Sequence, residues 1–207
     1  MATILGVVLA GGLSSRMGGG DKSLQPLGGR PLLSHILDRF APQVDGVILN
    51  ANGDPARFVP FGLPVAGDAV PGFVGPLAGV LAGLAWAREN RADVTDIVTV
   101  PGDGPFLPRD LVARMAAERS AAGADLACAL SAGQAYPVIG LWPVRLFENL
   151  RCAVVDEDIR KVDRWTARHH LVQVAFPTQP VDPFFNANTP EELAEAERLL
   201  HELGDAA

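Results

Sequence analysis

The sequence has few cysteines, and this limits the kinds of site it can build. Its two cysteines, Cys128 and Cys152, form no CxxC pair, and no histidine spacing completes a zinc site with them. Cys128 lies in an apolar stretch, where a buried structural thiol is the ordinary interpretation. The cysteines therefore predict no zinc site and favour a reducing compartment.

No apolar segment is long enough to cross a membrane. The first ten residues are apolar, but they lack the basic start of a signal peptide. The longest weakly polar stretch, residues 73–87, is shorter than the ~20 residues needed to span a bilayer and is interrupted by Gly75-Pro76. We therefore expect no membrane segment and a cytoplasmic protein.

Positive charge is also scarce. The 17 Lys and Arg residues stand against 24 Asp and Glu, and no basic run could follow a nucleic-acid backbone. Nucleic acid is therefore not expected as a partner. Any anionic ligand would have to be held by a few placed cations and backbone amides against an unfavourable net field.

What the sequence does have is enough apolar surface for a substantial core. Hydrophobic residues make up 48% of the 207 residues and charged residues 20%. The length is typical of one large domain, since domains usually run ~100–200 residues. No internal repeat or long linker divides the chain, so we expect one domain over residues 1–207.

Short apolar runs alternate with helical patterns along this chain. The apolar runs predict strands at 4–9, 46–50, 97–100, 126–130, 138–142 and 171–176. The helical patterns lie at 31–40, 77–89, 108–119, 143–150, 158–169 and 190–203. The alternation predicts an α/β fold, a three-layer α/β/α sandwich with a mostly parallel central sheet.

The first three strands read as nearly continuous apolar runs, which is typical of strands covered by helices on both faces. Right-handed crossovers would place the loops after Leu9, Asn50 and Val100 along one edge of the sheet, where open α/β folds bind ligands. The last helix has a clear start, with Thr189 as N-cap and Glu192 closing a capping box.

The loop after the first strand, residues 9–22, contains five glycines and two cations, Arg16 and Lys22. Glycines let successive N–H groups point at one anion, and the two cations could neutralise a polyphosphate. The loop is not a Walker A element, because Asp21 separates Gly20 from Lys22. A flexible turn with solvated cations is the alternative, but the position directly after a strand favours a nucleotide triphosphate site.

At these residues the sequence resembles the molybdenum cofactor guanylyltransferases, a nucleotidyltransferase family with the signature LAGG-x-S-x-RMG-x-x-DK. Every fixed position is met, from Leu9 to Lys22. Further blocks agree in the right order, at 47–52, 68, 75–79, 101–105 and 186–190. The chain departs from the family at Gly102 and Gly104, where larger residues are common, but keeps Asp103 between them.

The resemblance implies a Rossmann-like nucleotidyltransferase fold that transfers GMP from GTP to the terminal phosphate of molybdopterin or the molybdenum cofactor. Pyrophosphate would leave, and no general base is required because the attacking phosphate is already ionised. Arg16, Lys22 and a Mg²⁺ ion held by Asp103 would carry the charge. The resemblance assigns the guanine nucleotide to the N-terminal half, with contacts from Leu9, Ala10, Gly11, Gly12, Lys22, Asn50, Asp68 and Asp103.

The same resemblance assigns the acceptor mainly to the C-terminal half. The residues implied for the acceptor are Gly19 and, in the C-terminal half, Pro137, Arg160, Asn186 and Asn188. Arg160 or its neighbour Lys161 could hold the acceptor's phosphate, or both could belong to a solvated cationic helix face.

Each assigned polar residue also has a simpler interpretation. Asp103 could cap the turn before a helix, Asn50 could end its strand in a turn, and Asp68 could be a solvated loop carboxylate. For the whole chain, the alternatives are a cytidylyltransferase or another small-phosphate nucleotidyltransferase, and a silent nucleotide-binding regulatory domain. Transient contact with cofactor-delivering proteins or molybdoenzymes is compatible with the function but is encoded by no motif.

Overall fold

The computed structural model describes residues 2–11, 21–68, 70 and 75–205. Within them, the chain forms a seven-stranded sheet in the order β5-β4-β1-β6-β8-β7-β9 and a two-stranded sheet, β2-β3. The strands are β1 (Ile4–Leu9), β2 (Pro26–Leu27), β3 (Arg30–Pro31), β4 (Val47–Asn50), β5 (Val65–Ala66), β6 (Asp96–Pro101), β7 (Leu126–Ser131), β8 (Gln134–Pro143) and β9 (Leu171–Ala175).

The connections between these strands are mostly helical. The α-helices are α1 (Leu32–Phe40), α2 (Pro76–Asn90), α3 (Leu111–Ala122), α4 (Phe147–Val155), α5 (Val162–Thr166) and α6 (Pro190–Asp205). The 3₁₀ helices are η1 (Lys22–Leu24), η2 (Ala41–Gln43), η3 (Pro55–Phe61) and η4 (Val144–Leu146). In the part of the chain that the structure describes, no helix has the length and apolarity needed to cross a membrane.

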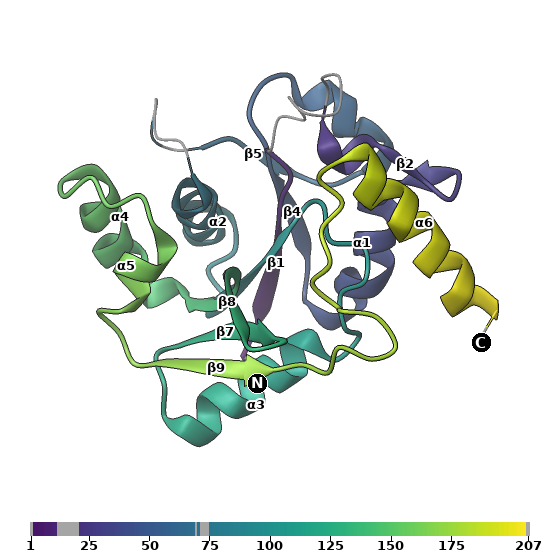
Figure 1. The fold of residues 1–207 in the computed structure, drawn as a ribbon. Coiled ribbons are helices and arrows are strands. Elements are labelled where there is room, and N and C mark those ends of the chain that lie inside the picture. Colours follow the sequence, from purple (N-terminus) through teal and green to yellow (C-terminus); the bar gives the residue numbers. More distant parts are fainter. Residues whose placement is uncertain (1, 12–20, 69, 71–74, 206–207) are drawn as a thin grey trace.

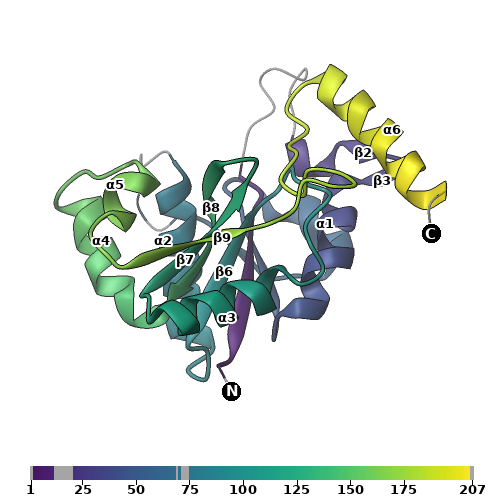
Figure 2. The same ribbon diagram turned by 60° about the horizontal axis from the view of Figure 1, so that its bottom comes forward.

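Helices cover both faces of the large sheet. Alternate residues of β1 bury into two separate cores, Ile4 and Val8 into one and Leu5 and Val7 into the other. The first core is completed by α1, α3 and α6, and the second by α2, α4 and α5. Figures 1 and 2 show α2, α4 and α5 on one side of β1, with α1 and α6 on the other. The predicted α/β/α sandwich is therefore confirmed.

Three parallel strands end together at one edge of the sheet. In β1, Leu9 is in register with Asn50 of β4 and with Pro101 of β6. The Ala10 N–H donates to the Asn50 carbonyl at 2.9 Å, and the Gly102 N–H donates to the Leu9 carbonyl at 3.0 Å. The loops that follow these strands therefore meet at one edge, as the sequence predicts.

The second half of the sheet is not wholly parallel. β8 runs antiparallel to both β6 and β7, whereas β9 is parallel to β7. The cause is the connection between β7 and β8, which contains only Ala132 and Gly133, both with positive φ. A connection this short can only form a hairpin, so β8 must reverse direction.

Some predicted helix boundaries are wrong. The helix expected at 158–169 is reduced to α5: Asp158 has a φ of 51°, which excludes it from a right-handed helix, and Lys161 is still extended just before α5 begins. The helix expected at 143–150 begins as η4 and continues as α4 to Val155. The start of α6 agrees with the sequence: the Glu192 N–H donates to Thr189 Oγ1 at 3.2 Å, and the Thr189 N–H donates to Glu192 Oε2 at 3.0 Å.

Candidate active site

A cavity of about 760 Å³ opens at the edge where β1, β4 and β6 end. This volume is in the range of small-molecule sites, which run ~300–1,000 Å³. Seven of the residues predicted to bind the nucleotide line the cavity: Leu9, Ala10, Gly11, Lys22, Asn50, Asp68 and Asp103. Gly12 and Arg16 lie outside the residues that the structure describes, as does Gly19 of the predicted acceptor set.

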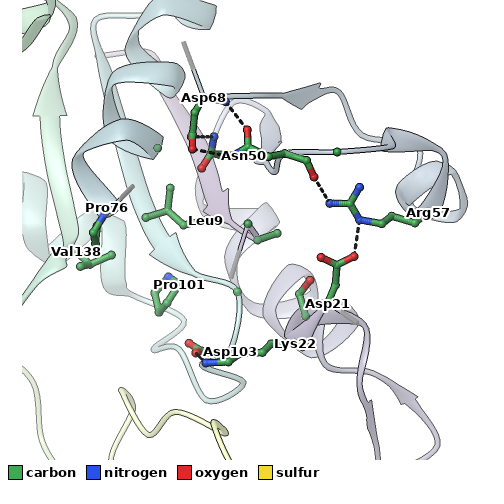
Figure 3. Close-up of a pocket in the computed structure, with 18 residues that line it drawn as sticks. Leu9, Asp21, Lys22, Asn50, Arg57, Asp68, Pro76, Pro101, Asp103 and Val138 are labelled. Atoms are coloured by element: carbon green, nitrogen blue, oxygen red, sulfur yellow. Dashed lines mark hydrogen bonds and ion pairs between the residues drawn. The ribbon is translucent and has the colours of Figure 1, made fainter. Parts of the chain in front are cut away.

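Polar side chains occupy two ends of the cavity. Figure 3 shows Asp68 and Asn50 at one end, Asp103 and Lys22 at the other, and Leu9 between them. The first pair belongs to the β4–β5 side and the second joins η1 to the loop after β6. The cavity therefore has two chemically different ends, separated by an apolar strand end.

At one end, a lysine lies between a carboxylate and an amide. Lys22 Nζ is 3.8 Å from Asp103 Oδ2 and donates a hydrogen bond to Asn188 Oδ1 at 2.6 Å. The main chain reinforces this arrangement, because the Ala187 N–H donates to the Asp103 carbonyl at 3.0 Å. The segment before α6 is thereby joined to the loop after β6, although the two are far apart in the sequence.

Asp103 lies in an environment that disfavours its charge. Burial raises the pKa of its carboxyl above the ordinary value, Lys22 opposes this shift, and Glu192 adds to it. A single lysine therefore does not fully compensate the partly buried carboxylate. A further cation beside Asp103 would stabilise its ionised form.

At the other end, Asp68 is held by two asparagines. Asn50 is buried, and its Nδ2 donates to Asp68 Oδ1 at 3.0 Å and to the Ala66 carbonyl at 3.2 Å. Asn52 Nδ2 donates to Asp68 Oδ2 at 2.7 Å, and the Asp68 N–H donates to Asn52 Oδ1 at 2.8 Å. Asp68 is thus a fixed carboxylate on the cavity wall rather than a freely solvated one.

Two glycines make room for this geometry. A Cβ at Gly79 of α2 would lie 2.5 Å from Asn50 Oδ1 and 2.6 Å from Leu9 Cδ2. A Cβ at Gly102 would lie 2.9 Å from the Leu9 carbonyl oxygen and 3.1 Å from Ala10 Cα. Gly102, where the family often has a larger residue, is therefore required by the close approach of the loops after β1 and β6.

The predicted acceptor residues that the structure describes lie beside the cavity rather than in its wall. Asn188 contacts Lys22, as described above. Asn186 lies beside the loop after β6, with Oδ1 3.4 Å from the position of a Cβ at Gly104. This oxygen is buried and has no hydrogen-bond partner among the described residues. It is therefore a buried acceptor beside the loop after β6 that the described residues leave unsatisfied.

The other two acceptor residues are less closely tied to the cavity. Pro137 is half-buried in β8, next to Val138, which does line the cavity. Arg160 is exposed, and its Nε donates to Asp158 Oδ1 at 2.9 Å. Its carbonyl oxygen is 3.6 Å from the position of a Cβ at Gly75, at the cavity wall. The structure therefore brings Arg160 near the cavity through its backbone.

Sequence reasoning missed part of the wall. Asp21 stands in the signature and Asn52 in the block 47–52, but neither received a role, and nothing in the sequence pattern marked Arg57. Arg57 lies in η3, a segment predicted as neither helix nor strand. The other lining residues that were not predicted are Ser23, Gly53, Gly75, Pro76, Gly79, Pro101, Gly102 and Val138.

The described residues do not form a complete metal cage. Among them, no group of three or more His, Cys, Asp or Glu side chains could hold a metal ion. Mg²⁺ does not need such a group when substrate phosphates are present, because one or two carboxylates then suffice. Asp103 fits this use, since it is a partly buried carboxylate that faces the cavity with a raised pKa.

Comparison with known proteins gives a consistent result. A family model described as a MobA-like NTP transferase domain matches residues 6–173. The chain is 59% identical over 194 residues to a molybdenum cofactor guanylyltransferase from Bradyrhizobium sp. (strain ORS 278), covering 94% of this chain and 92% of that protein.

Solved structures show the same fold. One is molybdopterin-guanine dinucleotide biosynthesis protein A from Archaeoglobus fulgidus, with a TM-score of 0.73, 22% identity and coverage of 96% of this chain and 99% of that one. Another is a protein from Mycobacterium tuberculosis H37Rv in complex with manganese, with a TM-score of 0.67, 20% identity and coverage of 95% and 99%. At such identities, the structural likeness shows the fold alone.

Proposed function

Because the chain belongs to the family of molybdenum cofactor guanylyltransferases, we propose that it transfers GMP from GTP to the terminal phosphate of molybdopterin or the molybdenum cofactor, with release of pyrophosphate. The observation that carries this proposal is the cavity with two ends, one with a fixed carboxylate and the other with a lysine beside a partly buried carboxylate. A nucleotide needs both, since its base is recognised by polar acceptors and its phosphates by cations.

The end with Asp68 suits the guanine base. The Watson–Crick edge of guanine presents an N1–H and an N2 amino group, which are both donors, and an ionised carboxylate is an acceptor only. Asn50 and Asn52 already donate to this carboxylate and fix its position. Asn50 therefore acts by holding Asp68, while a guanine N–H could use the remaining lone pairs.

The end with Lys22 suits the phosphates. The acceptor's phosphate attacks the α-phosphorus of GTP and needs no deprotonation near neutral pH. Lys22 would stabilise charge on the phosphate oxygens in the transition state, and Arg16 would add a second cation from the glycine loop. Asn188 holds the Lys22 ammonium from the other side, which limits its movement.

We assign a divalent cation to Asp103. The raised pKa of this carboxyl shows that Lys22 alone leaves its charge incompletely compensated. The manganese complex of the mycobacterial protein supports a divalent ion, and Mg²⁺ is the ion proposed for this chain. When bound, Mg²⁺ supplies neutralisation of phosphate charge. Asp103 would hold it, together with oxygen atoms of the substrate.

The acceptor would lie on the side of α6. Asn186 has a buried oxygen there with no partner among the described residues, and Asn188 connects the same segment to Lys22. Pro137, Gly19 and Arg160 remain assigned to the acceptor by family resemblance. β8 of the C-terminal half pairs with β6 of the N-terminal half, so both substrates would share one sheet, which supports a single domain over residues 1–207.

The test is pyrophosphate release with Mg²⁺ and molybdopterin or the molybdenum cofactor, with GTP, CTP and ATP compared side by side. We expect release with GTP only. A preference for CTP would reassign the enzyme as a cytidylyltransferase. If GTP binds but labelled pyrophosphate never exchanges into it, the chain is a silent nucleotide-binding domain.

A further inference from the structure

Arg57 is a cation of the cavity wall that the sequence patterns did not reveal. It lies in η3, whose start is capped by Asp54: the Ala56 N–H donates to Asp54 Oδ1 at 2.9 Å. The next residue, Phe58, is buried in the core, and the Arg57 guanidinium lies 4.7 Å from the centre of its ring. Arg57 is therefore attached to a fixed part of the wall.

Each nitrogen of its guanidinium faces a protein oxygen. Nε forms an ion pair with Asp21 Oδ2, Nη1 donates to the Asp54 carbonyl, and Nη2 donates to the Asn52 carbonyl at 2.5 Å. The Asp21 and Arg57 side chains are only 12% and 25% exposed, so this pair is shielded far more than a surface salt bridge. Nε makes an ion pair with Asp21 but no hydrogen bond, and Nη1 and Nη2 each donate to a backbone carbonyl, so the contacts that Arg57 makes are with protein groups (Figure 3).

The groups that Arg57 holds belong to the two ends of the cavity. Asp21 is the N-cap of η1, and its carbonyl accepts from the Leu24 N–H at 3.1 Å. The first residue of η1 is Lys22, whose ammonium faces Asp103. On the other side, Arg57 contacts Asn52, which in turn holds Asp68. One continuous set of contacts thus runs from the lysine end to the Asp68 end.

We propose that Arg57 is a positioning residue for nucleotidyl transfer: by holding Asp21 against the Asn52 wall, it fixes the Lys22 ammonium relative to Asp68. The proposal rests on the proposed function and adds to it how the two ends keep their separation. Transition-state stabilisation depends on such placement, since a shift of about 1 Å can reduce turnover about 100-fold.

The experiment compares Arg57→Gln, Asp21→Asn and the double variant with the wild-type enzyme. We expect each single variant to lower kcat about tenfold, with a smaller change in KM for GTP. The double variant should be no slower than the slower single one, because both changes break the same contact. Arg57→Lys should recover little, because one ammonium cannot replace a guanidinium that faces three oxygens.

Arg88 offers a matched control. It forms an ion pair with Glu148 at 2.7 Å and lies 4.4 Å from the centre of the Phe147 ring, so it makes the same two kinds of contact as Arg57 at a more exposed position. It is not among the cavity-lining residues of the described chain. Arg88→Gln should therefore leave kcat unchanged. If Arg57→Gln lowers the unfolding temperature but leaves kcat unchanged as well, Arg57 is only structural and the proposal is wrong.

The proposal is also wrong if Asp21→Asn is fully active while Arg57→Gln is not. In that case, Arg57 would act on the nucleotide directly, and its loss should raise the KM for GTP.

A second measurement needs no turnover. Lys22 and the exposed Lys161 can be acetylated with an amine reagent in the absence of nucleotide, and their rates compared by mass spectrometry. We expect Asp21→Asn and Arg57→Gln to raise the rate at Lys22 several-fold relative to Lys161. Equal ratios in all proteins would overturn the positioning role. If the wild-type enzyme releases no pyrophosphate, the proposed function fails, but this labelling result still decides the role of Arg57.

Discussion

Replacing Asp103 with asparagine should lower turnover strongly without destabilising the fold. The substitution keeps the size of the side chain and removes its charge. Lys22 Nζ lies 3.8 Å from the Asp103 carboxylate. Two opposite charges about 4 Å apart attract each other by about 4 kcal/mol at an effective dielectric constant of 20. The pKa of Asp103 is nevertheless raised, so the desolvation of its carboxylate outweighs this attraction.

The raised pKa fixes the sign of the effect on stability. A folded state that holds the Asp103 proton more tightly than the unfolded state gains stability below the ordinary pKa of about 3.9, and loses it as the pH rises through the folded pKa. At neutral pH, the ionised carboxylate therefore lowers the free energy of unfolding. Asp103→Asn should have an equal or higher unfolding temperature at pH 7.5, and the difference from wild type should disappear toward about pH 4.

The matched control is Asp96→Asn, at the start of β6, the strand that leads to Asp103. Asp96 is buried and forms an ion pair with Arg119 at 2.5 Å. Removing this charge leaves Arg119 without its ionic partner, which should lower the free energy of unfolding by on the order of 3 kcal/mol and leave kcat nearly unchanged. The two aspartates should thus behave in opposite ways.

The unfolding temperature is measured by calorimetry from pH 4 to pH 8 without added metal. Turnover is measured by pyrophosphate release with GTP and Mg²⁺. For Asp103→Asn, we expect kcat to fall at least about 100-fold, the loss typical of removing one transition-state electrostatic group. A fall of more than about 4 °C in unfolding temperature, about 1 kcal/mol or more for a chain of this size, would refute the argument from burial. Turnover within threefold of wild type would refute the catalytic role.

Three further substitutions test other parts of the site. Lys22→Ala should lower kcat about 100- to 1,000-fold, with the free energy of unfolding within about 1 kcal/mol of wild type, as measured by urea titration. Gly79→Ala should displace Asn50 and raise the KM for GTP about tenfold, whereas Gly83→Ala, one turn along α2, should affect only the unfolding temperature because its Cβ would meet core side chains. Asn186→Ala should raise the KM for the acceptor about fivefold without lowering the unfolding temperature, since its buried Oδ1 has no partner to lose among the described residues.

The central strands could be predicted from the sequence because the apolar run that marks each buried strand lies within a few consecutive residues. β1, β4 and β6 are covered by helices on both faces, so almost every residue in them is apolar. Their common edge then follows from right-handed crossovers, and this placed Leu9, Asn50 and Asp103 correctly at one cavity. The direction of β8 did not follow, because an apolar run reads the same in either direction. The two-residue connection Ala132-Gly133 is what makes β8 reverse direction. It was hard to recognise as a hairpin turn because alanine is not typical of a position with positive φ.

The base end of the cavity was harder to predict because it depends on tertiary contacts. β5 contains two residues, too few for a hydrophobic pattern, yet its pairing with β4 brings Asp68 to Asn50. The role of Arg57 could not be predicted for a different reason. Its side chain reaches Asp21 from a segment with no regular pattern, and the distance in sequence between the two gives no hint of their contact.

The charges of the described wall explain why an acidic protein would use a divalent cation here. Among the described residues that line the cavity, the cations are Lys22 and Arg57, and the carboxylates are Asp21, Asp68 and Asp103. Arg57 is committed to Asp21, and Lys22 is shared with Asp103, so this part of the wall offers a triphosphate no surplus positive charge. In the proposed function, this charge is assigned to Arg16 and to an ion that binds carboxylate and phosphate oxygens together. The proposed Mg²⁺ requirement thus has a basis in the wall's own electrostatics as well as in family membership.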